Sequence, residues 1–207
     1  MLVGLDFDNT IVCYDGLFHR LAVERGLIPA SLPATKQSVR DHLRAAGRED
    51  DWTELQGIAY GPRITDAVPF PGVTDCLRTL RKAGTGVAVV SHKTRHPYRG
   101  VRHDLHAAAH GFLRAHGFFE PAVTGLSPGR VFLELTLSAK LARVAALGCD
   151  AFVDDLPELL SEPAFPAGVR KILFDPAGAH RDEGADARVR SWAEVGEAIL
   201  AEGRVPA

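Results

Sequence analysis

The sequence predicts an α/β fold: a three-layer core around a mostly parallel sheet, with a small α-helical cap inserted after the first strand. Short runs of apolar, β-branched residues alternate along the chain with segments whose apolar residues recur at helical spacing. The short runs are apolar throughout rather than at every second position, which is typical of strands covered on both faces. One stretch, residues 14–68, departs from this alternation and shows only helical patterns.

Four runs bounded by turn residues are predicted as strands: Leu2–Phe7, Gly86–Ser91, Ala151–Asp154 and Val169–Phe174. Strands that alternate with helices form βαβ units with right-handed crossovers, and these units build parallel sheets.

Three helices are predicted in the core, over Gly72–Ala83, Ser138–Leu147 and the segment from Ser191 to about Glu202. The first two are followed by glycine, a common C-terminal cap. The third opens with Ser191-Trp-Ala-Glu194, a capping box in which the serine and glutamate satisfy free amides. The polar residues 175–190 are predicted as a loop.

The cap is predicted to hold helices over Leu17–Arg25, Thr35–Ala46 and Asp51–Ile58. Pro29 and Pro33 separate the first two. We therefore expect two domains: a catalytic core of residues 1–13 and 69–207, and a helical cap of residues 14–68 over the edge of the sheet.

Composition narrows the class of protein. Of the 207 residues, 46% are hydrophobic, which is enough for a core of ordinary size. A net charge of -2 argues against a dedicated partner among nucleic acids or anionic membranes. Three widely spaced cysteines suit a reducing compartment. No run is long enough to span a bilayer and the N-terminus lacks the features of a signal peptide, so we expect a soluble cytoplasmic protein.

Acidic and polar residues end three of the predicted strands. The first ends in Asp6-Phe7-Asp8, the second in Ser91, and the third in Asp154-Asp155. Side chains alternate along a strand, so Asp6 and Asp8 face the same way while Phe7 points into the core. Ligands of open α/β sheets bind beyond the carboxyl ends of the strands, so these groups are expected to converge. Several buried carboxylates need a cation, and hard oxygen ligands favour Mg²⁺.

The order of these residues resembles the four motifs of the haloacid dehalogenase (HAD) superfamily. The resemblance is carried by Asp6-Phe-Asp8-Asn-Thr10 after an apolar strand, by Ser91 ending VAVVS, by Lys140 near the start of a helix, and by Asp154-Asp155 ending AFVDD. It covers residues 1–13 and 69–175 and implies a Rossmann-like (HAD) core. It does not extend to the cap, so it identifies no substrate.

The resemblance implies a role for each matching residue. Asp6 would be the nucleophile that forms an aspartyl-phosphate. Asp8 would protonate the leaving group and then activate water, which requires a raised pKa, and its backbone carbonyl would also bind the metal. Lys140 would pair with both the phosphate and Asp6. Asn9 suits a tight turn, which Thr10 could hold by a local hydrogen bond.

Two sets of binding residues complete this prediction. The substrate-binding residues are Thr10, Ser91, the backbone amide of His92, and Lys93, which could instead be a solvated lysine. The ligands of Mg²⁺ are Asp6, Asp8, Asp154 and Asp155. Which member of the Asp154-Asp155 pair binds the metal directly stays open.

Three other patterns each allow two interpretations. His103, His106 and His110 on a predicted helix over Val101–His116 have a spacing compatible with zinc, but a polar helix face is favoured. The cap arginines Arg40, Arg44 and Arg48 share a helical face that could meet an anionic substrate or simply be solvated. Tyr60 and Arg63 could be specificity groups or part of a hinge.

The predicted function is a Mg²⁺-dependent phosphomonoesterase that acts on a small phosphorylated metabolite. A phosphosugar mutase of the same superfamily and a non-catalytic phospholigand-binding protein are the alternatives. Dehalogenation is disfavoured, because the resemblance implies that dehalogenases lack the second acid of the first motif and need no metal. The oligomeric state is not predicted.

Overall fold

A six-stranded parallel sheet forms the centre of the protein. The computed structural model describes residues 1–180 and 184–202. The strands are β1 (Leu2–Leu5), β4 (Gly86–His92), β5 (Val131–Glu134), β6 (Ala151–Asp154), β7 (Arg170–Phe174) and β8 (Ala187–Val189). Their order across the sheet is β5-β4-β1-β6-β7-β8, and every neighbouring pair is parallel. The predicted parallel α/β sheet is confirmed, and β1 lies inside it between β4 and β6.

Two edge strands were not predicted. β5 is mostly half-buried, and β8 has only three residues within the segment 175–190 that was predicted as a loop. That loop prediction is wrong for Ala187–Val189, and its residues 181–183 lie outside the described part of the chain. β8 lacks the continuous apolar run that marks the inner strands, because edge strands are covered less completely. β5 contains the apolar run Val131-Phe132-Leu133, which was not recognised as a strand.

Apolar clusters on the two sides of the sheet make it the middle of three layers. On one face of the sheet, Val3, Leu5 and Val89 belong to the larger apolar cluster. On the other face, Val90 and Phe152 belong to the smaller one. Gly4 lies between Val3 and Leu5 on β1. A Cβ atom built there would lie 2.5 Å from the Phe152 ring, so the strand needs glycine at this position.

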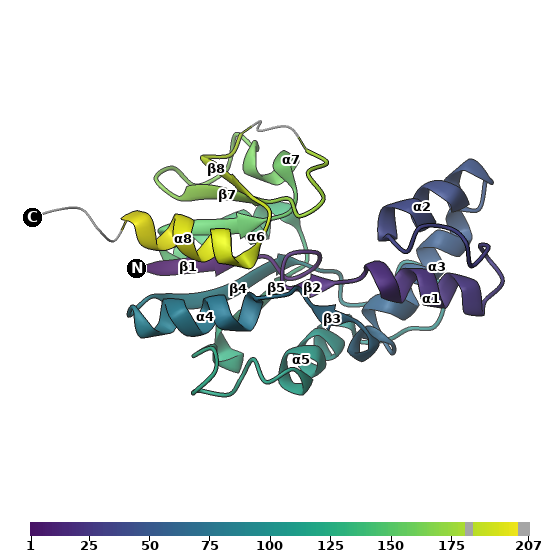
Figure 1. The fold of residues 1–207 in the computed structure, drawn as a ribbon, viewed down its shortest axis with the longest axis horizontal. Helices are drawn as coiled ribbons and strands as arrows, with labels where there is room; N and C mark the ends of the chain where they lie inside the picture. The colour runs from purple at the N-terminus through teal and green to yellow at the C-terminus, as the bar shows by residue number, and fades with distance from the viewer. Residues whose placement is uncertain (181–183, 203–207) are drawn as a thin grey trace, which may run out of the picture.

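Helices cover both faces of the sheet (Figure 1). Two of them, α4 (Val73–Lys82) and α8 (Trp192–Glu202), pack together over one face, and α5 (Leu105–Ala115) packs on the same apolar cluster. α6 (Leu137–Leu147) and the short α7 (Pro157–Leu160) pack on the smaller cluster. Ser191 caps α8 as predicted, because the Glu194 amide donates to Ser191 Oγ at 3.2 Å. The Glu194 carboxylate accepts from the Arg190 amide at 2.8 Å, one residue before the position that a capping box predicts. A 3₁₀ turn, η2 (Pro128–Arg130), precedes β5.

Residues 14–68 contain three helices that pack on one another: α1 (Asp15–Glu24), α2 (Lys36–Ala45) and α3 (Glu49–Tyr60). In Figure 1 they form a group at one side of the sheet, which we call the helical lobe. A 3₁₀ turn, η1 (Ile64–Asp66), follows α3. The chain enters and leaves the lobe through a two-stranded antiparallel ribbon of β2 (Val12–Cys13) and β3 (Val68–Pro69). No helix in the described residues has the length and apolar character needed to cross a membrane.

Candidate active site

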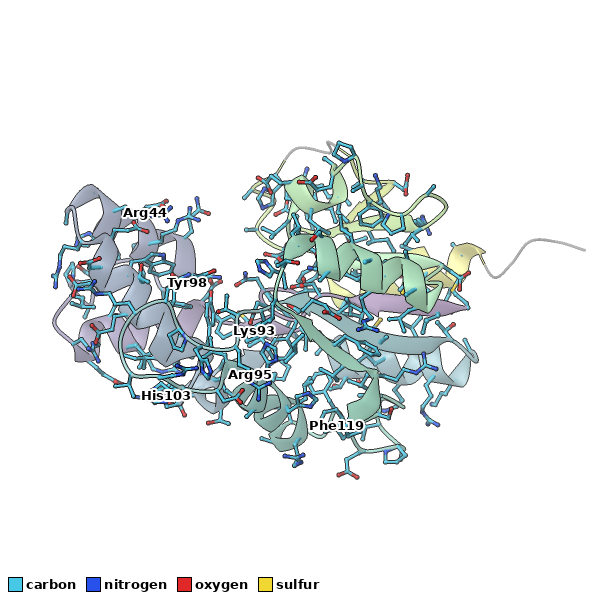
Figure 2. All side chains as sticks on the ribbon, turned by 180° about the vertical axis from the view of Figure 1, so that it is seen from behind. Arg44, Lys93, Arg95, Tyr98, His103 and Phe119 are labelled. Atoms are coloured by element: carbon cyan, nitrogen blue, oxygen red, sulfur yellow. The ribbon has the colours of Figure 1, made fainter. Side chains whose placement is uncertain are left out.

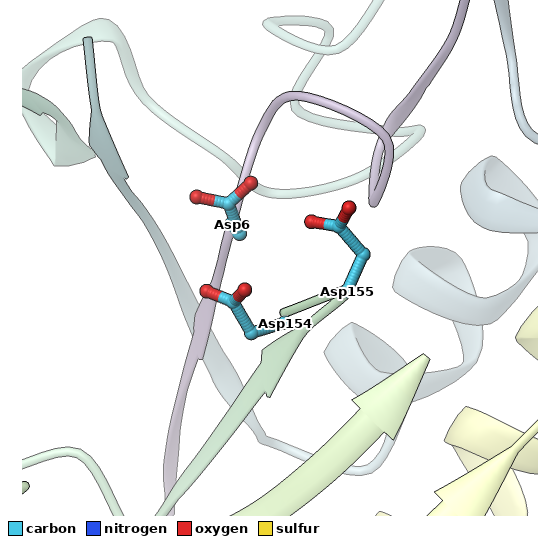
Figure 3. A group of neighbouring side chains, drawn as sticks. All are labelled: Asp6, Asp154 and Asp155. Atoms are coloured by element: carbon cyan, nitrogen blue, oxygen red, sulfur yellow. The ribbon is translucent and has the colours of Figure 1, made fainter. Parts of the chain in front are cut away.

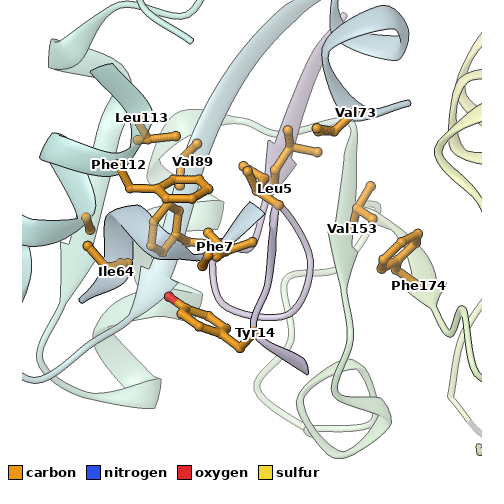
Figure 4. Packing of buried hydrophobic residues seen from close by; sticks show 14 of the residues in the cluster. Leu5, Phe7, Tyr14, Ile64, Val73, Val89, Phe112, Leu113, Val153 and Phe174 are labelled. Carbon is orange, nitrogen blue, oxygen red and sulfur yellow. The ribbon is translucent and has the colours of Figure 1, made fainter. Parts of the chain in front are cut away.

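The segment after β1 positions the two acids of the first motif. Its first residue, Asp6, continues the sheet by donating its backbone N–H to the Val153 carbonyl at 2.9 Å. Phe7 is fully buried and packs edge-on against Phe112, with ring centroids 5.9 Å apart (Figure 4). The chain then turns through Asn9, whose φ of 58° lies in the left-handed region that asparagine tolerates. The predicted burial of Phe7 and the predicted turn at Asn9 are both confirmed.

Lys140 connects Asp6 with the acid that ends β6. Its Nζ lies 2.6 Å from Asp6 Oδ1 and 2.6 Å from Asp154 Oδ2, and all three side chains are buried. Burial lowers the pKa of the lysine, but Asp6 and Asp154 outweigh that effect and raise it. Lys140 lies in the first turn of α6, whose start is capped by Thr136 Oγ1. The structure thus brings Lys140 to Asp6, as expected.

Asp6, Asp154 and Asp155 form one carboxylate cluster at the carboxyl ends of β1 and β6 (Figure 3). Each offers an oxygen atom within 4.8 Å of the others. Burial and the neighbouring Asp154 raise the pKa of Asp6 to about 7, against the attraction of Lys140. Burial, Asp154 and Asp6 also raise the pKa of Asp155 well above its usual range. The carboxylates of this cluster repel one another when they are ionised. A hard divalent cation such as Mg²⁺ would fit between their oxygen atoms and remove that repulsion.

The members of this cluster differ in their protein partners. Asp154 accepts from the Leu156 amide on Oδ1 and from Lys140 on Oδ2. Within the described residues, Asp155 accepts no hydrogen bond from the protein. Asp155 is therefore the better candidate for direct metal binding, and Asp154 the better candidate for positioning Lys140.

Asp8 belongs to a separate network. Its carboxylate accepts hydrogen bonds from Lys93 Nζ at 2.7 and 2.9 Å and from the Tyr14 hydroxyl at 2.6 Å. Burial raises the pKa of Asp8, but Lys93 and Tyr14 together lower it below its usual value. The predicted raised pKa is therefore wrong, because these two partners stabilise the carboxylate. Lys93 is buried, so its interpretation as a solvated lysine is also wrong.

Replacing Lys93 with methionine is expected to raise the pKa of Asp8 above 3.8, its usual value, because burial then acts on a carboxylate that has lost its main cation. Titration of the aspartate carboxyl groups by ¹³C NMR would measure the shift. Tyr14→Phe, which removes one hydrogen bond, should give a smaller rise. An unchanged titration of Asp8 in Lys93→Met would contradict the assignment of Lys93 as the dominant partner.

The remaining predicted substrate-binding residues lie at the same end of the sheet or next to it. Ser91 is buried near the end of β4, and His92 follows it with an exposed side chain. Thr10 is fully buried, and its hydroxyl has no hydrogen-bond partner in the described part of the chain. The expected local hydrogen bond of Thr10 is thus wrong. Its carbonyl instead accepts from Trp192 Nε1 at 3.2 Å, which ties α8 to the site loop.

The three-histidine face is not formed. α5 begins at Leu105, so His103 precedes the helix, and the only group of potential metal ligands among the described residues is the carboxylate cluster. His106 instead bonds through Nε2 to the Lys93 carbonyl at 2.9 Å. His110 packs near Phe119 at 6.1 Å. His106 thus supports the segment that carries Lys93.

The lobe arginines Arg40, Arg44 and Arg48 form surface ion pairs with Asp41, Glu49 and Asp51. Figure 2 shows Arg44 on the lobe, well separated from Lys93 at the site. These contacts support a solvated charged face.

A different lobe cation reaches the site and was not predicted. Lys36, the first residue of α2, extends its Nζ to within 2.9 Å of Asn9 Oδ1. Tyr14 and Tyr60 also line this region, with Tyr60 next to both Lys36 and Lys93. A lysine in the first turn of an amphipathic helix carries no pattern that separates it from a surface lysine, so only the fold reveals its position.

No protein-family model matches the sequence, and no curated protein is significantly similar to it. Solved structures are similar over nearly the whole chain. One is a HAD family hydrolase from Deinococcus radiodurans with bound phosphate and sodium, with a TM-score of 0.60, 21% identity, and coverage of 100% of this chain and 98% of that one.

Two further similar structures carry different activities in their names. An L-2-haloacid dehalogenase has a TM-score of 0.58 and 13% identity, over 96% of this chain and 98% of its own. A HAD phosphatase from Thermococcus onnurineus has a TM-score of 0.51 and 16% identity, over 96% and 97%. At these identities the likeness shows a shared fold.

Proposed function

Because the chain has the fold of the haloacid dehalogenase superfamily, we propose that it is a Mg²⁺-dependent phosphomonoesterase acting on a small phosphorylated metabolite. The observation that carries the proposal is the position of Asp6, which lies 2.6 Å from Lys140 and within one cluster with Asp154 and Asp155. A carboxylate attacking an anionic phosphate needs nearby positive charge. Lys140 supplies one such charge, and the cluster offers ligands for another.

In the proposed reaction, a carboxylate oxygen of Asp6 attacks phosphorus while the bond from phosphorus to the ester oxygen breaks. The products of this step are an aspartyl-phosphate and the leaving alcohol, which takes a proton from Asp8. Water then attacks the aspartyl-phosphate, passing a proton to Asp8 and releasing phosphate and free Asp6. This covalent route divides one difficult displacement into two easier ones.

The metal would be held by Asp6 and Asp155, with Asp154 beside them. When bound, it supplies positive charge that neutralises the phosphoryl oxygens and the three carboxylates. Lys140 keeps Asp6 and Asp154 in place before any ligand arrives, because its two ion pairs join β1 to β6.

Asp8 must carry a proton in the first step, yet Lys93 and Tyr14 favour its ionised form. A phosphate ester that attracts Lys93 would weaken the ion pair between Lys93 and Asp8. The pKa of the half-buried Asp8 would then rise at the moment when its proton is needed. The contact between these two side chains therefore supports a role for Lys93 in controlling Asp8, in addition to binding substrate.

Asp8 and the carboxylate cluster argue against two of the other activities considered for this fold. Asp8 and the metal-compatible cluster have no role in the metal-free dehalogenation that the family resemblance implies. A protein that only binds phospholigands has no need of Asp8. A phosphosugar mutase would use the same residues and remains the second candidate. The three free cysteines agree with the cytoplasm as its location.

The test is phosphate release from a panel of phosphate esters, beginning with a generic aryl phosphate, with and without Mg²⁺. We expect turnover that requires Mg²⁺ and is abolished by EDTA. Isomerised sugar phosphate without net release would favour the mutase instead. The absence of turnover across the whole panel would reject the phosphatase.

The metal ligands can be separated in the same assay. Asp155→Asn should raise the Mg²⁺ concentration required for half-maximal activity by at least about 10-fold, because it replaces a carboxylate oxygen ligand by a neutral amide. Asp150→Asn serves as the control, because Asp150 precedes β6 at the end away from the cluster. The amide oxygen of asparagine can still accept the hydrogen bond that Asp150 receives from the Leu2 amide. Equal Mg²⁺ requirements in Asp155→Asn and the unmodified protein would remove Asp155 from the site.

A further inference from the structure

Three lysines lie at the candidate site, and their partners differ. Lys140 pairs with Asp6 and Asp154, and Lys93 pairs with Asp8. Lys36 forms no ion pair with a carboxylate within 4 Å among the described residues. Its ammonium group donates a hydrogen bond to the neutral amide oxygen of Asn9, at 2.9 Å. Of the three ammonium groups, that of Lys36 is the one whose charge is not matched by a contacting acid.

The lobe holds Lys36 in a defined position. Its backbone N–H donates to Asp15 Oδ1 at 2.8 Å, which joins the start of α2 to the start of α1. Thr35 caps the same helix by accepting from the Ser38 amide at 3.0 Å. The Lys36 ammonium lies 5.4–5.7 Å from the ring centroids of Tyr14, Phe18 and Tyr60. Aromatic faces at this distance attract a cation without neutralising it.

The surroundings keep Lys36 charged. Burial lowers the pKa of its ammonium, but the Tyr60 hydroxyl and the carboxylates of Asp8 and Asp155 outweigh burial and raise it. The side chain is half-buried, so its charge is shielded from bulk water but still open to a ligand. A permanently protonated amine is a poor nucleophile and a good partner for an anion.

The position of Lys36 relates it to the leaving group. It comes from the lobe and touches the loop residue that follows Asp8. In the proposed reaction, Asp8 protonates the leaving oxygen, so the rest of the substrate extends from the Asp8 side of the phosphorus atom. A group on the leaving portion would therefore meet Lys36, with the rings of Tyr14 and Tyr60 beside it.

We propose that Lys36 binds a second anionic group of the substrate, so that the preferred substrates are phosphate esters whose leaving portion carries its own carboxylate or phosphate. This inference rests on the proposed phosphatase function, which it narrows to doubly anionic metabolites. Tyr14 and Tyr60 position the ammonium, and Asn9 holds it when no ligand is bound.

The test compares substrates that differ only in this charge. The probes are 3- and 4-carboxyphenyl phosphate, their methyl esters as neutral counterparts, and 1,4-phenylene bisphosphate. We expect kcat/KM for the better carboxylate to exceed that of its methyl ester by about 10- to 100-fold, the range of a charge-assisted hydrogen bond. A preference for the bisphosphate over both carboxylates would assign the second group as phosphate.

Lys36→Met should reduce the ratio of kcat/KM between the carboxylate and its methyl ester to about 1. Lys36→Arg should keep part of this preference. Lys82→Met, which removes an exposed lysine of α4, is the matched control and should keep the full ratio. Thermal unfolding of each variant shows whether it is folded. If the unmodified protein and Lys36→Met hydrolyse aryl phosphates with the same ratio, the inference fails while the phosphatase function stands.

Binding of non-hydrolysable phosphonates tests the anion site independently of phosphatase activity. By calorimetry, 3- or 4-carboxyphenylphosphonate should bind at least about 10-fold more tightly than phenylphosphonate, and Lys36→Met should remove the difference. This result in a protein without phosphatase turnover would support the anion site and reject the phosphatase. Equal affinities for charged and neutral phosphonates in the unmodified protein would reject the anion site.

Discussion

Replacing Asp6 with asparagine is expected to reduce phosphate release by at least about 1,000-fold and, in the metal-free protein, to increase thermal stability at pH 8. The loss of activity follows from removing the proposed nucleophile with little change in shape. The gain in stability follows from the pKa of Asp6, which burial raises to about 7 from a usual value of 3.8.

The sign of the stability effect follows from proton binding. Between pH 4 and 7 the folded protein keeps a proton on Asp6 that the unfolded chain has released, so the free energy of unfolding falls as the pH rises through this range. Above pH 7 that loss persists. Asparagine has no such titration, so we expect Tm to rise by about 2–8 °C at pH 8 and the difference to vanish near pH 4.

A matched control is Asp75→Asn, which removes an exposed acid that pairs with Arg78 on α4. It should change neither turnover nor Tm by much, because exposed ion pairs contribute little. A lower Tm for Asp6→Asn at pH 8 would mean that ionised Asp6 stabilises the fold. Full activity in that variant would reject Asp6 as the nucleophile.

The site residues that end strands could be predicted from the sequence, and the reason is physical. Asp6 and Asp154 directly follow continuous apolar runs, and parallel strands bring such ends together at one edge of the sheet. Lys140 could be recognised by the family resemblance and because no other lysine lies between Lys93 and Lys171. The positions of Asp6 and Asp154 depend only on the sheet, whose apolar runs are clear in the sequence.

The partners of Asp8 could not be predicted in the same way. Lys93 directly follows β4 and Tyr14 directly follows β2, so their contact with Asp8 depends on how these segments turn. A lysine just after a strand is more often solvated than buried. Lys36 is harder still, because its place at Asn9 requires the packing of α2 on α1. The pKa of Asp8 was therefore predicted in the wrong direction, since the sequence reveals the acids but not the cation beside each one.

Lys140→Met is expected to have the largest effect on stability, with a loss of about 3–5 kcal/mol at pH 8. Removing one member of a buried ion pair leaves an uncompensated charge, and here two carboxylates lose their shared cation. Protonation of Asp6, whose pKa is about 7 even beside Lys140, removes the repulsion between them. Urea unfolding at pH 8 and pH 5 should therefore show a large loss of stability at pH 8 and a much smaller one at pH 5.

The double variant Lys140→Met/Asp154→Asn distinguishes charge from packing as the cause. If unpaired charge destabilises Lys140→Met, neutralising Asp154 should recover part of the lost stability at pH 8, since one of the two repelling carboxylates is gone. Phosphate release should remain at least about 100-fold low in both variants, because Asp6 still lacks its cation. Equal destabilisation of Lys140→Met at pH 5 and pH 8, without recovery in the double variant, would show that the lysine acts through the packing of its methylene chain. Recovery at pH 8 would instead show that the chain keeps its buried carboxylates at the expense of stability and depends on Lys140 to hold them together.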